Sequence, residues 1–158
     1  MIYFAYGGNV DAQQMRLRCR GARQVGVARL DGYRLSFPRY SFIRQSALAS
    51  IEEAVDEAIW GALYEVAESD LKRLDACEGY FVASDRAGNP YNRIDVQVHY
   101  LEGGRAAAFT YVASPMAYTG EPSREYLSHI ARCGAALGFP DDYVQKILSL
   151  APERAEAA

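Results

Sequence analysis

The apolar pattern of this chain changes in its C-terminal third, from a two-residue repeat to a helical one, and that change restricts the fold more than any other feature. Tyr91–Tyr100 alternates apolar and polar residues, and Gly103 and Gly104 then lead into a second strand at Ala106–Ala113. Helical spacing takes over afterwards, with one helix opening at Ser123. Strands first and helices late predict an α+β domain built on a mostly antiparallel sheet or small barrel.

Shorter strands are expected earlier in the chain, at Val25–Arg29, Tyr33–Phe37, Ala47–Ile51 and Ala58–Val66. Asp31 and Gly32 separate the first two, and this dipeptide is typical of a tight hairpin turn. Gly61, inside the most apolar of these strands, indicates a bulge or the close approach of another backbone. No repeat or linker is visible, so we expect a single domain over residues 1–150 and a disordered tail over residues 151–158.

Composition excludes several classes of function. The 158 residues are half hydrophobic and carry a formal net charge of -3, with no lysine or arginine cluster that would follow a phosphate backbone, so nucleic-acid binding is not expected. The longest apolar stretches are too short to span a membrane, and the N-terminus lacks a signal-peptide pattern. We therefore expect a cytoplasmic protein, a monomer or a homodimer.

The cysteines and histidines predict neither a metal site nor a disulfide framework. Cys19, Cys77 and Cys133 are widely spaced, odd in number and contain no CxxC pair. Buried free thiols are the expected state. His99 and His129 receive no role, and no cofactor is expected.

The N-terminal segment reads as a strand, a glycine loop and the start of a helix. Ile2–Ala5 is a short apolar run that stops at Gly7, Gly8 and Asn9, residues suited to tight turns. Asp11, with Gln14 three positions later, matches an N-terminal capping box. Such a loop presents backbone N–H groups to an anionic or carbonyl-bearing ligand, but the same pattern also describes a plain turn.

Glu78 is the strongest candidate for a general acid and base. It ends a short helix expected over Asp70–Cys77 with Ser69 as its N-cap, and Gly79 follows as the helix-terminating glycine. The negative end of the helix dipole, the neighbouring Asp75 and the apolar residues that follow would all raise its pKa. The alternatives are a solvated glutamate at a helix end and, with less support, one carboxylate of a glycosidase pair.

Several segments in the same order make this chain resemble the γ-glutamylcyclotransferase superfamily, which includes γ-glutamylamine cyclotransferases and the plant avirulence-induced proteins. The segments are YFAYGGN, WGALYEV, DLKRLDACEGY and YNRIDVQV. The resemblance implies a small antiparallel barrel flanked by helices. It also implies an enzyme that cyclises a γ-glutamyl group of a small substrate to 5-oxoproline and releases an amino acid or amine without metal or cofactor. A non-catalytic binding or scaffold relative is the alternative.

The resemblance also assigns roles to individual residues. It implies Glu78 as the acid and base, with Tyr6, Gly7, Gly8 and Asn9 as the substrate-binding loop. The family loop usually reads Tyr-Gly-Ser-Asn, so Gly8 stands where relatives carry a hydroxyl.

The same resemblance implies that three further tyrosines line the pocket: Tyr91, Tyr111 and Tyr126. An equal alternative is that they are ordinary half-buried aromatic residues. For Arg93, two residues after Tyr91, an ion pair with a nearby carboxylate is favoured over contact with a ligand.

Overall fold

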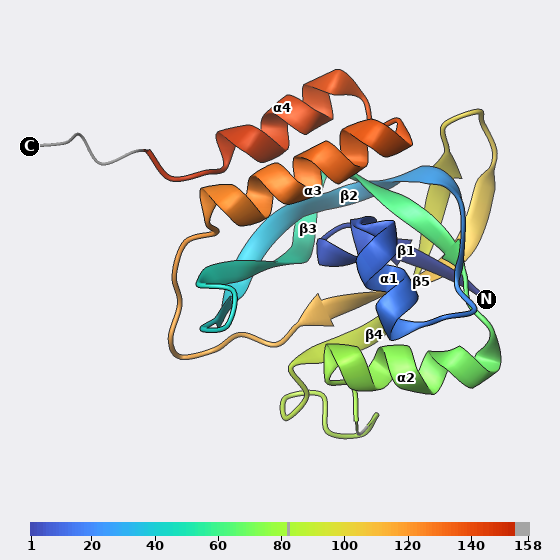
Figure 1. Ribbon diagram of the computed structural model, residues 1–158, viewed down its shortest axis with the longest axis horizontal. Helices are drawn as coiled ribbons and strands as arrows, with labels where there is room; N and C mark the ends of the chain where they lie inside the picture. Colours follow the sequence, from blue (N-terminus) through green and yellow to red (C-terminus); the bar gives the residue numbers. More distant parts are fainter. Residues whose placement is uncertain (82, 154–158) are drawn as a thin grey trace, which may run out of the picture.

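The chain forms a closed five-stranded barrel with helices packed around it (Figure 1). A computed structural model describes residues 1–81 and 83–153. The strands are β1 (Ile2–Ala5), β2 (Arg23–Ser41), β3 (Ser46–Glu65), β4 (Tyr91–Tyr100) and β5 (Arg105–Ala113). The helices are the 3-10 turn η1 (Gly8–Val10), α1 (Ala12–Arg18), α2 (Glu68–Glu78), α3 (Arg124–Leu137) and α4 (Asp141–Ser149). The predicted α+β class and barrel are confirmed.

Antiparallel pairing dominates the barrel, as predicted, and a single parallel contact closes it. Around the barrel the order is β1-β3-β2-β4-β5, and Tyr3 of β1 pairs with Phe109 of β5 in the parallel sense. The buried hydroxyl of Thr110 donates to the carbonyl of Phe4 at 2.7 Å across the same junction. Closure leaves no free sheet edge at this junction.

The predicted hairpin around Asp31 and Gly32 is wrong, because both flanking segments belong to the single strand β2. Gly32 has a φ of 81°, and the pairing with β3 jumps there from Asp31 opposite Ala58 to Tyr33 opposite Glu53. A left-handed glycine allows an irregularity of this kind without ending the strand. The reversal of direction comes instead at residues 42–45, at the far end of the long β2–β3 hairpin.

The predicted close approach at Gly61 is confirmed. A Cβ atom on this residue would lie 2.7 Å from the carbonyl oxygen of Ala5 and 2.5 Å from the ring of Phe4. Glycine is therefore required for β1 and β3 to pair at this distance. The pairing fixes where β1 ends and the glycine loop begins.

Helices cover the barrel on two sides (Figure 1). α3 and α4 lie side by side over β2 and β3, and Leu127, Ile130 and Ile147 join the barrel core there. On the other side, α1 and α2 bury Met15 and Leu74 in a second cluster. In residues 1–81 and 83–153, no helix combines the length and the apolar character that crossing a bilayer requires.

Most of the predicted helix ends are confirmed. Asp11 caps α1 by accepting from the N–H of Gln13 at 2.9 Å, and Ser123 caps α3 in the same way. α2 begins one residue earlier than Ser69 and is preceded by Ala67, so Ser69 is not its cap.

The C-terminal segment is described only in part. Ala151 packs against the core, and the carbonyl of Pro152 accepts from Arg124. The rest of the tail predicted over residues 151–158, from residue 154 on, lies outside the described residues.

Candidate functional site

A cavity of about 430 Å³ opens where the η1 loop, the end of α2, the tip of the β2–β3 hairpin and α3 meet. Pockets of this size accommodate small molecules. Seven of the eight site residues predicted from the sequence line it: Tyr6, Gly7, Gly8, Asn9, Glu78, Tyr91 and Tyr126. The fold therefore brings the N-terminal loop and the glutamate, 69 residues apart, to one place.

The eighth, Tyr111, does not line the cavity. Its hydroxyl donates to Oδ1 of Asp75 at 2.7 Å, and its backbone carbonyl accepts a short hydrogen bond from the hydroxyl of Tyr6. Arg93 pairs with Oδ2 of the same aspartate at 2.8 Å, which confirms the ion pair expected for this arginine. Tyr111 thus holds Tyr6 and Asp75 in place from behind the cavity wall.

Glu78 ends α2 in a geometry that depends on the residue after it. Gly79 has a φ of 78°, in the left-handed region, and a Cβ there would lie 2.7 Å from the ring of Pro90. The glycine that ends the helix was predicted, and it directs the glutamate into the cavity wall. The Glu78 side chain is only 14% exposed.

Two donors reach the same oxygen of this carboxylate. Oε1 of Glu78 accepts from Nδ2 of Asn9 at 2.9 Å and from the guanidinium of Arg18 at 2.9 Å. Burial raises the pKa of Glu78, while the charge of Arg18 and the hydrogen bond from Asn9 oppose that shift. The expected direction is confirmed, with burial as the largest cause. Asp75, expected to add repulsion, is itself paired with Arg93.

Asn9 connects the glycine loop to the glutamate. Its side-chain amide donates to Glu78 and to the hydroxyl of Tyr3 at 3.0 Å, and its Oδ1 accepts from Gln14. Its backbone carbonyl accepts from Tyr64 at 2.8 Å. With its side chain engaged on three sides, Asn9 is suited to positioning Glu78.

Tyr91 and Tyr126 converge on the backbone of a single residue, Ala49 of β3. The hydroxyl of Tyr91 donates to the carbonyl of Ala49 at 2.9 Å, and that of Tyr126 accepts from its N–H at 3.0 Å. Tyr126 therefore keeps its own O–H proton for another acceptor. Burial raises the pKa of Tyr126, more than the hydrogen bond from Ala49 lowers it, so the phenol stays neutral and remains a donor.

The space beside Gly8, where the family resemblance implied a serine side chain, is occupied by Gln14. A Cβ on Gly8 would lie 2.9 Å from Nε2 of Gln14. That amide donates to Asn9 at 2.9 Å and accepts from Arg44 at 2.6 Å through its oxygen. The predicted capping box is thus only half formed, because Asp11 caps the helix while Gln14 turns toward the cavity.

Three arginines of the cavity were missed by sequence reasoning: Arg18, Arg39 and Arg44. Arg39 donates to the carbonyl of Ser114 at 2.8 Å, and Arg44 lies 5.8 Å from the ring centre of Tyr126. Arg18 follows Gln14 by one helical turn, so both lie on one face of α1. This spacing could have predicted that the two side chains reach the same site. Arg39 and Arg44 come from the tip of the β2–β3 hairpin. Nothing in the sequence near them indicates that this tip approaches the glycine loop.

Comparison with known proteins agrees with this barrel fold. The model of the AIG2-like family matches residues 58–147. Human γ-glutamylcyclotransferase is 27% identical over 155 residues, which cover 96% of this chain and 79% of the human protein. The bovine γ-glutamylcyclotransferase is 28% identical over the same coverage. A solved structure of a γ-glutamyl cyclotransferase superposes with a TM-score of 0.86 at 26% identity, covering 100% of this chain and 92% of that one.

The fold and these comparisons therefore define a γ-glutamylcyclotransferase-like protein. The chain belongs to the AIG2-like family. The resemblance seen in the sequence is confirmed, and the human and bovine relatives are enzymes.

Proposed function

We propose that this protein is a cyclotransferase that converts a γ-glutamyl amino acid to 5-oxoproline and a free amino acid. The observation that carries the proposal is the buried carboxylate of Glu78, held at 2.9 Å by Asn9 beside the glycine loop. A glutamate whose pKa is raised by burial can both accept and return a proton near neutral pH.

The reaction needs little more than orientation and one proton carrier. The substrate's own α-amino nitrogen attacks the γ-carbonyl carbon, and the bond from that carbon to the departing nitrogen breaks. Glu78 accepts the proton that the attacking nitrogen loses and returns it to the departing nitrogen, so the carboxylate ends the cycle unchanged. Because the attack is intramolecular, holding the chain in a bent conformation supplies a large part of the acceleration.

The developing oxyanion requires donors that are already in place. Gly7, Gly8 and Asn9 line the cavity, and their backbone N–H groups are the donors that we assign to this role. Tyr126 adds a neutral hydroxyl whose proton is not used by Ala49. These groups bind the γ-carbonyl oxygen or the α-carboxylate of the substrate.

The charges of the cavity favour a substrate with two carboxylates. Arg18 is paired with Glu78, whereas Arg39 and Arg44 contact neutral partners through the bonds described above. A γ-glutamyl amino acid carries an α-carboxylate on each side of the scissile bond, and two guanidinium groups match them. A γ-glutamyl amine lacks the second carboxylate.

The test is release of 5-oxoproline from a panel of γ-glutamyl amino acids and γ-glutamyl amines. We expect release from the amino-acid series, and we expect Glu78→Gln to lower kcat by about 10²–10⁴-fold because the proton carrier is gone. Thermal unfolding of the variant checks that the fold is kept. If the wild type binds these compounds without turnover, the chain is a binding relative and the proposal fails.

A further inference from the structure

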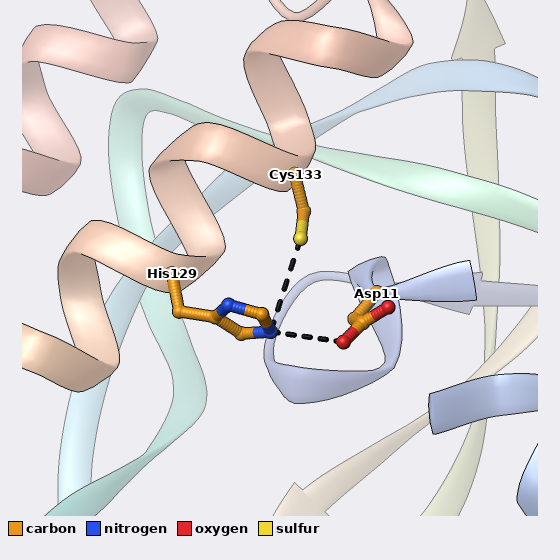
Figure 2. A group of neighbouring side chains, drawn as sticks. All are labelled: Asp11, His129 and Cys133. Atoms are coloured by element: carbon orange, nitrogen blue, oxygen red, sulfur yellow. Dashed lines mark hydrogen bonds and ion pairs between the residues drawn. The ribbon is translucent and has the colours of Figure 1, made fainter. Parts of the chain in front are cut away.

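Outside the cavity, three side chains with metal-binding chemistry meet between α1 and α3 (Figure 2). Nε2 of His129 lies 2.9 Å from Oδ2 of Asp11 and 3.9 Å from Sγ of Cys133. The ligand atoms of the three residues all lie within 4.8 Å of one another. None of the three residues is among those that line the substrate cavity.

Both contacts of His129 use the same ring nitrogen, and this excludes the simplest catalytic explanation. A cysteine–histidine–aspartate relay needs the thiol on one imidazole nitrogen and the carboxylate on the other. Here the carboxylate and the thiol both contact Nε2 of the imidazole (Figure 2). Three possible ligand atoms are thus gathered within 4.8 Å of one another, and one metal ion can reach all three when it replaces the proton between His129 and Asp11.

The distances fit a tetrahedral ion after small side-chain movements. Bonds of about 2.0–2.3 Å place the ligand atoms of a tetrahedral zinc site about 3.3–3.6 Å apart. The observed 2.9 Å and 3.9 Å separations lie on either side of that range. Rotation of side chains that are only partly buried suffices to equalise them.

Rigid elements hold all three residues. His129 and Cys133 are one turn apart on α3, whose Leu127 and Ile130 are buried in the core. Oδ1 of Asp11 is fixed by the N–H of Gln13 as the helix cap, so Oδ2 is the oxygen that faces the histidine. A metal ion can therefore bind without disturbing either helix.

We propose that Asp11, His129 and Cys133 form a site for a zinc-like transition-metal ion, with solvent at the fourth position. A thiolate, an imidazole and a carboxylate suit zinc or cobalt, whereas magnesium and calcium prefer oxygen ligands. The side chains of His129 and Asp11 are 41% and 21% exposed, which leaves room for a water ligand. The ion would tie α3, which carries Tyr126, to the segment that carries Asn9.

The test uses cobalt(II) as a spectroscopic probe of the full chain after treatment with a chelator. We expect one equivalent to give the d–d bands of a tetrahedral site and a thiolate-to-cobalt charge-transfer band. Cys133→Ser should remove the charge-transfer band. His129→Gln and Asp11→Asn should weaken cobalt binding at least tenfold, and asparagine keeps the helix cap.

Cys77→Ser is the matched control, because Cys77 is an exposed thiol on α2 and is not one of the three clustered residues. It should bind cobalt as the wild type does. Circular dichroism without metal establishes that each variant is folded. The proposal is overturned if the wild type gives no charge-transfer band, if Cys133→Ser keeps it, or if Cys77→Ser loses it. Because the readout is the metal, it is independent of cyclotransferase activity.

Discussion

At the scale of single residues, the ionisation of Glu78 is a balance between burial, which raises its pKa, and the charges and hydrogen bonds around it, chiefly those of Arg18. Removing the carboxylate from water raises its pKa, and Arg18, in contact at 2.9 Å, lowers it. The apolar residues that follow Glu78 indicated the first effect, whereas nothing in the local sequence indicated the approach of Arg18. The charge of Arg18 therefore opposes the upward shift that burial gives to the pKa of Glu78.

Arg18→Gln should therefore move the acid limb of the kcat/KM profile to higher pH. In the proposed mechanism the ionised carboxylate is the base. Loss of the positive charge raises the pKa of Glu78 further, so more alkaline conditions are needed to ionise it. A pH profile with a γ-glutamyl amino acid measures the limb. Arg16→Gln, an exposed arginine on the same helix, should leave the limb unchanged. A limb that stays in place or moves to lower pH in Arg18→Gln would contradict this assignment.

At the scale of elements, the long β2–β3 hairpin completes the cavity. Its tip brings Arg39 and Arg44 to the glycine loop, and Figure 1 shows the tip beside the connection from β5 to α3. Backbone hydrogen bonds from Met116 to Pro38 and from Ala47 to Glu121 secure this contact. The hairpin reaches that far because Gly32 interrupts the pairing without ending the strand.

Arg44→Gln should reduce discrimination between the two substrate classes. We expect KM for γ-glutamyl amino acids to rise about tenfold, equivalent to about 1.4 kcal/mol, because one charged contact to a carboxylate is lost. KM for γ-glutamyl amines should change little. Arg34→Gln, an exposed arginine of β2 that does not line the cavity, is the matched control. An equal rise in KM for both substrate classes would show that Arg44 does not bind the second carboxylate.

At the scale of the whole molecule, closure of the barrel sets the position of the loop. β1 is only four residues long, yet it pairs with β3 on one side and β5 on the other, and the glycine loop follows directly. The parallel pairing between β1 and β5 is short. The hydrogen bond from the Thr110 side chain to the carbonyl of Phe4 therefore helps to hold the barrel closed. Its partner carbonyl is buried with Phe4 in the core.

Thr110→Val should destabilise the fold by about 1–3 kcal/mol, because the replacement keeps the volume but removes the donor to a buried carbonyl. Urea unfolding measures the loss, and hydrogen exchange should be faster for amides of β1 and β5 than in the wild type. Thr110→Ser keeps the hydroxyl and should lose less stability. A valine variant as stable as the wild type would mean that the carbonyl finds another donor.

The sequence by itself determined the features that depend on neighbours along the chain. The alternation of Tyr91–Tyr100, the caps at Asp11 and Ser123 and the glycine after Glu78 each have a local physical cause, and the structure has them all. The order of motifs also identified the family. Local signals failed at Asp31 and Gly32, because a left-handed glycine permits a turn or a bulge and only the partner strand decides between them.

Tertiary structure alone decided what surrounds the glutamate. Arg18 and Arg44 reach the cavity from segments far from Glu78 in the sequence, and Tyr111 is held behind its wall by Asp75. The Asp11–His129–Cys133 cluster likewise joins a helix start to a helix more than a hundred residues later. Burial and charge pairing depend on the distance between atoms in space, so no pattern along the chain could set the pKa of Glu78.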